Sequence, residues 1–486
     1  MHMNFPSFKH KGNSYFFSGE GNIHYLHPIM YGILNNSSEQ HLAENASDSA
    51  KADIDYYTGK IKFFKENGLF ESKKKNTRYA RMSSEVVKKN TEDVSQLVFE
   101  VTDSCNLRCS YCAYRELYDN YLPRTGKKLS FADVKYTLDS LFCLWNRKHT
   151  LKDLNIGFYG GEPLLNMNFI MEVVNYINEE YRQSSRRISY SITTNGVLLS
   201  KYMDFFVENN FHLLISLDGN KENNVYRRNP KNENSFNTVV GNINQLKEKY
   251  PEYFRSNVSF SSVLHNKNSV EDIVSFFKET YGKTPMIGEV NANGVDNSKK
   301  DKFMHIYKNM LEDMSKTPNA DILKEDMGAN YPETLSATIF SYTHIQGFYN
   351  NYLEVFHMKR SGKHFPTGTC LPFKKKMYLS VNKQIFPCEK IGHNFQLGNF
   401  GNNILNLDYE DIAKKYNELY DSMDYLCSSC YASESCTQCL FYLPSIGKCN
   451  SYMNKQNFSE FLSKKYSYII ENSELCFRIF RNFKMR

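Results

Sequence analysis

Three cysteines in the run CNLRCSYC stand close enough together to share one metal group. They are Cys105, Cys109 and Cys112, spaced three and then two residues apart, and Tyr111 directly precedes the last of them. Three thiolates at this spacing can hold three irons of a [4Fe–4S] cluster and leave the fourth iron open. An open iron can bind a substrate or cosubstrate, so the run predicts a place for chemistry. A zinc site would need four ligands, and this stretch supplies no fourth candidate.

Seven more cysteines are concentrated near the carboxyl end of the chain. They are Cys370, Cys388, Cys427, Cys430, Cys436, Cys439 and Cys449, four of them in the run CSSCYASESCTQC. Pairs of the CxxC type serve both iron–sulfur clusters and zinc, so a zinc ribbon is the structural alternative. The two remaining cysteines, Cys143 and Cys476, are predicted to be small buried hydrophobes.

Length and charge limit the class of protein. The chain has 486 residues, enough for two to four domains, and a formal net charge of +7. Its basic residues are scattered, which predicts no nucleic-acid partner. The first residues lack the apolar run of a signal peptide, and no stretch reaches the ~18 apolar residues of a membrane span. We therefore expect a cytoplasmic, soluble, metal-rich enzyme without a membrane partner.

Extended and helical patterns alternate from residue 96 to residue 316. The predicted strands are Leu97–Thr102, Leu154–Tyr159, Ile188–Thr193, His212–Leu217, Val258–Val263 and Pro285–Asn291. The predicted helices lie near 130–145, 168–183, 199–209, 237–249, 269–280 and 301–316. Six such units favour a parallel sheet that curls into a partial (β/α)6 TIM-like barrel, which makes the fold class α/β.

The polar motifs of this segment directly follow the predicted strands. Cys105 follows the first strand, Gly160 the second, Asn195 the third and Asp218 the fourth. Because the carboxyl ends of parallel strands meet at one edge of a sheet and form its active site, the four motifs are expected to share one site.

The remaining segments are assigned as separate parts. Residues 1–95 are predicted to form a small α+β, winged-helix-like module, 317–365 a connector, 366–450 a cysteine-rich domain, and 451–486 a tail with a helix at 458–482. Within the module, extended runs at Asn13–Phe17 and Asn22–Tyr25 flank a Gly19–Gly21 turn. Helical patterns at 27–35 and 57–70 enclose a polar loop at 35–52, and the Lys73–Lys75 run follows as a linker. The module resembles precursor-peptide recognition domains, and a structural N-terminal extension is an equal alternative.

The run CNLRCSYC resembles the signature of radical S-adenosylmethionine (radical SAM) enzymes. This resemblance implies that the open iron binds S-adenosylmethionine and that reductive cleavage yields a 5′-deoxyadenosyl radical. In FYGGEP, Gly160 and Gly161 would expose backbone to the methionyl headgroup, and Glu162 would take up its ammonium. The other cosubstrate-binding residues that it implies are Tyr111, Thr194, Asn195, Ser216, Asp218 and Arg227. Asn223 and Asn224 stand where a His-Asp pair is frequent, so this loop departs from the family pattern. The lesser alternative is that Arg227 or Arg228 is a surface arginine in a polar loop.

The second cysteine region resembles the SPASM extension of radical SAM maturases, which binds two auxiliary [4Fe–4S] clusters. By that resemblance, the outer cluster would be held by Cys427, Cys430, Cys436 and Cys449. The inner cluster would be held by Cys370, Cys388 and Cys439. Lys383 replaces a glycine that is common before Cys388, and the Cys436–Cys439 spacing is one residue tighter than usual. With three cysteines, the inner cluster either takes another ligand or keeps an open iron for a substrate thiolate.

The combined resemblance, over residues 97–450, implies a radical SAM/SPASM peptide maturase. It would bind a ribosomally made precursor peptide and form a crosslink within it. A thioether is the favoured crosslink, and a C–C or C–O bond is the next candidate. A flavodoxin or ferredoxin would donate electrons, and Glu389 would accept a proton, unless it is a surface residue in a turn. The alternatives are a sulfatase-maturing enzyme that makes formylglycine, an RNA-modifying enzyme and a non-catalytic peptide-binding scaffold.

Overall fold

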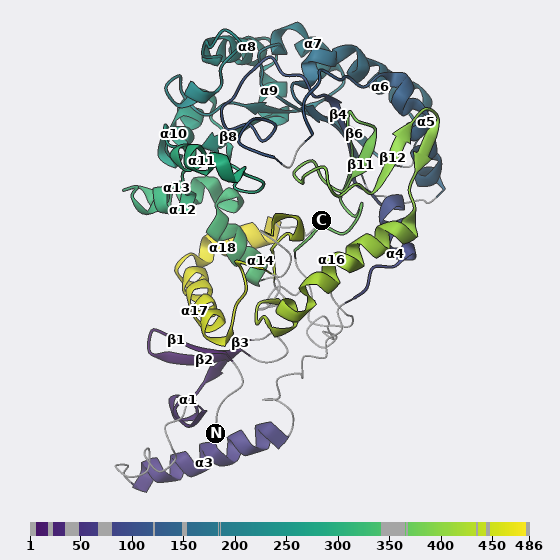
Figure 1. The fold of residues 1–486 in the computed structure, drawn as a ribbon. Coiled ribbons are helices and arrows are strands. Elements are labelled where there is room, and N and C mark those ends of the chain that lie inside the picture. Colours follow the sequence, from purple (N-terminus) through teal and green to yellow (C-terminus); the bar gives the residue numbers. More distant parts are fainter. Residues whose placement is uncertain are drawn as a thin grey trace. The chain divides into compact units, whose positions relative to one another are not determined.

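The structure, a computed structural model, describes residues 6–17, 23–34, 48–66, 80–119, 122–147, 153–182, 184, 186–341, 365, 368–433, 436–443 and 448–482. The chain forms two compact units that do not follow the order of the sequence (Figure 1). The first unit contains residues 1–81, 328–369 and 418–486, and the second contains 82–327 and 370–417. The two ends of the chain therefore belong to the same unit.

The second unit is built on a ten-stranded mixed sheet of order β13-β12-β11-β10-β4-β5-β6-β7-β8-β9. The strands from β4 to β9 are all parallel to their neighbours, and each corresponds to one of the six predicted strands. Their bounds are Gln96–Thr102 (β4), Leu154–Gly160 (β5), Ile188–Thr194 (β6), His212–Ser216 (β7), Val258–Leu264 (β8) and Met286–Glu289 (β9). The alternating pattern of the sequence thus gives the barrel-like parallel part of the sheet.

One helix precedes β4 and the others follow the parallel strands, and most of them lie along the outside of the sheet (Figure 1). They are α4 (Ser84–Glu92), α5 (Phe131–Asn146), α6 (Met167–Glu180), α7 (Met203–Glu208), α8 (Phe236–Lys249), α9 (Pro251–Asn257), α10 (Val270–Tyr281), α11 (Lys300–Ile306), α12 (Met310–Ser315) and α13 (Ala320–Met327). The helix predicted at 301–316 is in fact two, because Asn309 is extended and caps α12 by accepting a hydrogen bond from the Glu312 amide at 3.0 Å. Helix α9 was not predicted. It begins at Pro251, where the missing proline N–H costs nothing.

The two faces of the sheet differ in polarity because successive side chains of a strand point to opposite sides. On the face under the helices, Phe99 of β4 packs against Phe169 of α6, with ring centroids 5.7 Å apart. On the other face, the Asn155 Oδ1 atom accepts hydrogen bonds from Gln96 at 3.1 Å and from Ser191 at 2.7 Å. The helical side of the sheet therefore supplies the core, and the opposite side presents polar groups.

The cysteine-rich segment extends this same sheet. Its strands are β10 (Lys376–Leu379), β11 (Gln384–Phe386), β12 (Gly398–Gly401) and β13 (Ile404–Asn406). Strand β10 pairs in parallel with β4, so that Tyr378 lies beside Val98, whereas β11, β12 and β13 pair antiparallel. The Glu100 side chain reinforces this junction, because its Oε2 atom accepts a hydrogen bond from the Val381 amide at 3.0 Å.

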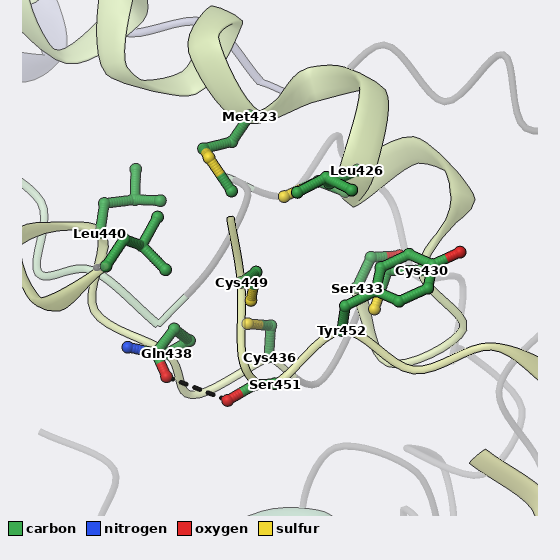
Figure 2. A pocket seen from close by; sticks show the side chains of 12 residues that line it. Met423, Leu426, Cys430, Ser433, Cys436, Gln438, Leu440, Cys449, Ser451 and Tyr452 are labelled. Carbon is green, nitrogen blue, oxygen red and sulfur yellow. Dashed lines mark hydrogen bonds between the residues drawn. The ribbon is translucent and has the colours of Figure 1, made fainter. Parts of the chain in front are cut away.

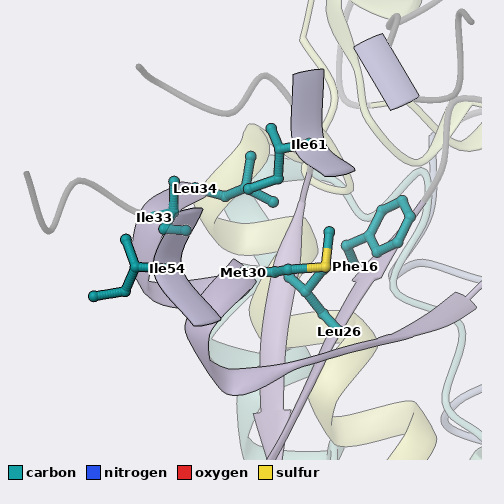
Figure 3. Packing of buried hydrophobic residues seen from close by; sticks show 7 residues of the cluster. All are labelled: Phe16, Leu26, Met30, Ile33, Leu34, Ile54 and Ile61. Carbon is teal, nitrogen blue, oxygen red and sulfur yellow. The ribbon is translucent and has the colours of Figure 1, made fainter. Parts of the chain in front are cut away.

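The first unit contains a three-stranded antiparallel sheet, β1 (Ser7–His10), β2 (Asn13–Phe17) and β3 (Ile23–Leu26). Helices α1 (Pro28–Leu34) and α3 (Asp48–Glu66) pack beside it. Their shared core, shown in Figure 3, consists of Phe16, Leu26, Met30, Ile33, Leu34, Ile54 and Ile61. The prediction of a loop up to residue 52 was wrong for 48–52, because a helix anchored by two buried isoleucines one heptad apart extends cooperatively in both directions. The Gly19–Gly21 turn and the Lys73–Lys75 run lie outside the described residues.

The other helices come from the carboxyl-terminal half of the chain. They are α14 (Pro332–Phe340), α16 (Tyr409–Ser429), α17 (Lys455–Glu471) and α18 (Ser473–Asn482). The single terminal helix predicted at 458–482 is two helices, because the backbone leaves the helical conformation at Asn472. None of the helices in the described ranges combines the length and apolar composition that a membrane crossing requires.

Candidate active site and metal centres

The three cysteines of CNLRCSYC lie in the loop that leaves β4, and their thiols are largely buried. Burial raises the pKa of Cys109 to about 12, and the neighbouring Cys105 and Cys112 push it in the same direction, while Arg227 opposes them. Burial also raises the pKa of Cys105. Thiols gathered in such a setting stay protonated unless a metal replaces their protons, and soft thiolates suit an iron–sulfur cluster.

Gly160 and Gly161 let the cysteine loop lie directly against the end of β5. A Cβ on Gly161 would stand 2.0 Å from the Ser104 carbonyl oxygen, and one on Gly160 would stand 2.4 Å from that of Thr102. Those two carbonyls accept hydrogen bonds of 2.8 Å from the amides of Gly161 (to Thr102) and Glu162 (to Ser104). The space that side chains would fill is thus occupied by the loop backbone, whereas the sequence analysis assigned it to the methionyl headgroup. Contact with the cosubstrate stays a prediction for both glycines.

Glu162 binds the end of the neighbouring strand β6. Its Oε1 atom accepts a hydrogen bond from the Thr194 hydroxyl at 2.7 Å, and its Oε2 atom accepts one from the Asn195 amide at 2.7 Å. The side chain is 1 % exposed, and burial raises its pKa to about 7 in spite of these bonds. The structure therefore brings three of the predicted residues together around a carboxyl group that lacks a cationic partner among the hydrogen bonds and ion pairs of the described residues.

Asn195 also reaches the cysteine loop. Its Nδ2 atom donates a hydrogen bond of 2.7 Å to Asn106 and lies 3.8 Å from the Cys105 sulfur. The ends of β4, β5 and β6 are thereby joined by hydrogen bonds at one edge of the sheet, where parallel α/β sheets place their active sites.

Asp218, at the end of β7, is fully buried and enclosed by protein groups. Its Oδ2 atom accepts a hydrogen bond from the Tyr111 hydroxyl. Its Oδ1 atom lies 3.0 Å from the Arg227 Nε atom and accepts a hydrogen bond from the Val263 amide at 3.1 Å. Burial alone would raise the pKa of Asp218, but Arg227, His265 and Tyr111 together lower it. Asp218 is therefore placed to position Tyr111 and Arg227. Its predicted contact with the cosubstrate stays untested.

Arg227 is a buried residue of the site, 8 % exposed, and not the surface arginine of the alternative interpretation. Its guanidinium lies 5.6 Å from the centre of the Tyr111 ring. Burial acts to lower its pKa, but the Asp218 carboxylate raises it by more, so the group stays cationic. Ser216, the remaining predicted contact, is half-buried at the end of β7 beside Ser261 of β8.

His265, which no sequence motif singled out, also belongs to this cluster. It is fully buried, its ring stacks on Tyr111 with centroids 5.9 Å apart, and its Nε2 atom lies 3.8 Å from Asp218. Asn224, which the sequence analysis noted only as a departure, accepts a hydrogen bond from the Asp218 amide at 3.3 Å. No spacing rule pointed to either residue. His265 follows β8 and comes near Asp218 through the pairing of β7 with β8, whereas Asn224 lies six positions after Asp218 in the same loop.

Glu389 forms an ion pair with Lys376, whose Nζ atom lies 2.8 and 2.7 Å from its two carboxylate oxygens. Burial would raise the pKa of Glu389, but Lys376 lowers it. The Cys388 sulfur lies 3.6 Å from the same carboxylate. Glu389 is therefore an ionised, half-buried carboxylate beside a candidate metal ligand. It is not an exposed residue of a turn.

Four cysteines of the first unit line one pocket (Figure 2). They are Cys427, Cys430, Cys436 and Cys449, the set that the SPASM resemblance assigns to the outer cluster. The pKa of Cys427 is raised to about 12 by burial and by the other three thiols, so these sulfurs fit a metal group that would replace their protons. Within the described ranges, no group of His, Cys, Asp and Glu side chains is close enough to hold a single metal ion. The inner set, Cys370, Cys388 and Cys439, is divided between the two units and stays a prediction.

Comparison with known proteins assigns one segment of the chain to a known type of domain. Residues 99–279, from β4 to α10, match the Radical SAM superfamily. The chain carries a radical SAM domain. This domain implies a [4Fe–4S] cluster and S-adenosylmethionine, and the cysteine loop, which Gly160 and Gly161 allow to lie against β5, fits the cluster.

The curated relatives of this chain share parts of its length. A cysteine-type anaerobic sulfatase-maturating enzyme of Clostridium novyi is 32% identical over 39% of this chain and 49% of its own. The enzyme of that type from Clostridium perfringens is 24% identical over 76% of this chain and 91% of its own. The radical SAM cyclopropyl synthase TigE of Paramaledivibacter caminithermalis is 26% identical over 36% of each chain. The chain thus spans about half the length of the first of these relatives.

A solved structure shares the fold of this chain. Native anSMEcpe with bound AdoMet superposes with a TM-score of 0.51 at 18% sequence identity, over 80% of this chain and 100% of that one. The overlap confirms the predicted α/β fold beyond the family match. About a fifth of this chain has no counterpart in that structure.

Proposed function

We propose that the protein is a radical SAM maturase that forms a crosslink in a ribosomally made precursor peptide. The observation that carries this proposal is the small sheet β1–β3, with α1 and α3, in one compact unit with the four-cysteine pocket. A three-stranded sheet with a helical side is a common scaffold for binding an extended peptide. TigE, a relative, is named for a modification made by a radical SAM enzyme.

The residues around the cysteine loop have distinct roles in this proposal. The Glu162 carboxylate forms an ion pair with the methionyl ammonium, because this buried carboxyl group has no cationic partner among the described residues. Arg227 pairs with the carboxylate, and Asp218 holds Arg227 and Tyr111 in place. Thr194, Asn195 and Ser216 line the edge at which the ribose would lie. When bound, the cluster and S-adenosylmethionine supply a 5′-deoxyadenosyl radical, which removes hydrogen from an unactivated carbon.

Crosslink formation requires the substrate to lose a hydrogen atom to this radical, a proton to a base and one electron to an acceptor. Glu389 is proposed as the base and auxiliary clusters as the electron acceptor. The outer auxiliary cluster would be held by Cys427, Cys430, Cys436 and Cys449, and the inner one by Cys370, Cys388 and Cys439. If the inner cluster has an open iron, the favoured crosslink is a thioether. A C–C or C–O crosslink is the next candidate product. A flavodoxin or ferredoxin would supply the electron that starts each turnover.

A second candidate function is maturation of a sulfatase, in which a cysteine or serine becomes formylglycine. The curated relatives from Clostridium novyi and Clostridium perfringens favour it, because both carry that name. The small N-terminal sheet gives the peptide-crosslinking proposal its advantage over this candidate.

The deciding experiment is an anaerobic reconstitution followed by an assay for 5′-deoxyadenosine. The proposal expects about twelve irons per chain and 5′-deoxyadenosine with S-adenosylmethionine and dithionite. A Cys105/Cys109/Cys112→Ala variant should lose both a third of the iron and all of the product. A precursor peptide encoded near the protein should then gain a crosslink, detected by tandem mass spectrometry, whereas a carbonyl that reacts with a hydrazine on a sulfatase peptide would favour the second candidate. Zinc without 5′-deoxyadenosine would refute both.

A further inference from the structure

The N-terminal sheet of the first unit rests on helix α17, near the other end of the chain. Phe17 of β2 meets Phe458 with ring centroids 5.2 Å apart, and Tyr15 of the same strand meets Tyr466 at 4.9 Å. The side chain of His10 in β1 completes the contact through a 2.8 Å hydrogen bond to the Ser467 hydroxyl. Phe16 of β2 packs with α1 and α3, so its neighbours Tyr15 and Phe17 point to the opposite face of the sheet, which needs an apolar partner surface of its own. Helix α17 supplies that surface.

The beginning of α17 is joined to the four-cysteine pocket. The Met453 amide donates a hydrogen bond to the Cys430 sulfur at 3.4 Å, and the Tyr431 amide donates one to the Met453 carbonyl at 3.0 Å. Asn454 then caps the helix by accepting a hydrogen bond from the Asn457 amide at 2.9 Å. Five residues, 450–454, therefore separate Cys449, a proposed metal ligand, from Lys455, the first residue of α17.

One apolar cluster spans both contacts. Its buried members are Phe8, Phe17, Phe340, Cys430, Ala432, Phe458 and Leu462. Phe458 and Leu462 are fully buried on α17 between the sheet and the cysteine loops. Movement of the Cys430 loop would therefore disturb the surface on which β1 and β2 lie.

We propose that metal bound by Cys427, Cys430, Cys436 and Cys449 clamps the N-terminal sheet onto helix α17. A metal group that ties these loops together fixes Cys430, Met453 and the start of α17. Part of its binding free energy therefore stabilises the packing of β1 and β2 on α17. Without it, nothing ties the four cysteine side chains to one another across the pocket, and the support of the sheet loosens. The four-cysteine centre thus determines whether the peptide-binding surface is formed, apart from any role in electron transfer.

This inference rests on the proposed metal site, but it requires neither iron as the metal nor a particular peptide substrate. Hydrogen–deuterium exchange of β1–β3 tests it in the full-length protein. In a Cys427→Ser/Cys449→Ser variant, which leaves Cys430 in the apolar cluster, amide exchange in β1–β3 should rise about tenfold or more. Exchange in β4–β9 should stay unchanged. Cys143→Ser is the matched control, because Cys143 of α5 is exposed and the prediction that it is buried was wrong.

A second pair of variants tests the coupling from the other direction, since coupling between two events is reciprocal. Phe458→Ala should speed loss of the metal to a chelator about tenfold, whereas Ile470→Ala, at an exposed position of the same helix, should leave it unchanged. Unchanged β1–β3 exchange after metal loss, verified by metal analysis, would overturn the inference. So would equal metal release from the two α17 variants. The 5′-deoxyadenosine assay is separate, so failure of the enzymatic proposal would be seen independently.

Discussion

The hydroxyl of Tyr111 donates a hydrogen bond to the carboxylate of Asp218, although 107 positions separate the two residues in the chain. This bond ties the cysteine loop after β4 to the end of β7. Because Asp218 also pairs with Arg227, a single carboxylate sets the positions of an aromatic ring beside the proposed cluster and of the cation proposed for the cosubstrate carboxylate. A buried carboxylate with both oxygens engaged is a positioning group for the site.

Loss of this bond should weaken S-adenosylmethionine binding by more than it lowers protein stability. Tyr111→Phe removes one hydrogen bond to a charged acceptor, for which we expect a loss of about 1.5–3 kcal/mol shared between cosubstrate affinity and unfolding. Asp218→Asn should cost more, about 3–5 kcal/mol, because it leaves Arg227 buried without its counter-charge. Equilibrium dialysis with S-adenosylmethionine and thermal unfolding separate the two effects. Tyr253→Phe, whose hydroxyl bonds the distant Phe211 carbonyl, is the control and should alter stability alone.

The affinity for S-adenosylmethionine should increase as pH rises through about 7. Burial holds the Glu162 pKa at about 7, and only the ionised carboxylate attracts an ammonium group. Below that pH the group is protonated, so each unit of further acidification should cost up to about tenfold in affinity. Isothermal titration between about pH 6 and pH 8 measures this slope. Glu162→Gln should bind weakly with a flat profile, and a steep profile in that variant would assign the titration to another group.

A methyl group at Gly161 should disrupt the site, whereas one at Gly241 should be harmless. The Gly161 Cβ would overlap the Ser104 carbonyl, so Gly161→Ala has to displace the cysteine loop, and we expect much of the cluster iron to be lost. Gly241 lies in α8 with nothing near its Cβ position, and alanine there should stabilise the helix by about 0.5–1 kcal/mol. Iron content and thermal unfolding of the two variants provide the comparison. Equal iron in both would show that the loop tolerates displacement.

Glu100 should make the protein less stable as pH rises from about 5 to about 8. Burial raises its pKa to about 7, so the folded protein keeps a proton that the unfolded chain has already lost. The stability present at low pH is therefore lost as pH passes through about 7, by roughly 1–3 kcal/mol. Glu100→Gln retains a hydrogen-bond acceptor for the Val381 amide and should remove this pH dependence of the stability. Thermal unfolding of both proteins against pH measures the difference, which should favour the variant increasingly at high pH; a constant difference would contradict the assignment.

Variants of the Lys376–Glu389 ion pair distinguish a catalytic role of Glu389 from a structural one. Glu389→Gln should leave 5′-deoxyadenosine formation intact but lower crosslinked product about a hundredfold, if Glu389 takes the substrate proton. Lys376→Met leaves the carboxylate buried without its cation and should destabilise the protein by up to about 3–5 kcal/mol. The double variant should regain that stability but not the product. Recovery of product in the double variant would show that Glu389 serves only as the partner of Lys376.

Local patterns in the sequence were enough to define the parallel strands and the cysteine motif. Side chains alternate along a strand with period two, and a motif directly after a strand has to lie at its carboxyl end, so β4 to β9 and the edge with Glu162 and Asn195 could be predicted. The spacing of Cys105, Cys109 and Cys112 along the chain is visible in the sequence and does not depend on the tertiary structure.

The tertiary structure alone decided which distant groups meet. It showed that β10 extends the barrel sheet beside β4, that the Gly161 position makes room for the cysteine loop, that Asp218 and His265 share one buried cluster, and that β1–β3 rest on α17. These are partnerships between segments far apart in sequence. They depend on which surfaces exclude water together and which buried polar groups satisfy each other, and neither condition leaves a periodic signal in the chain.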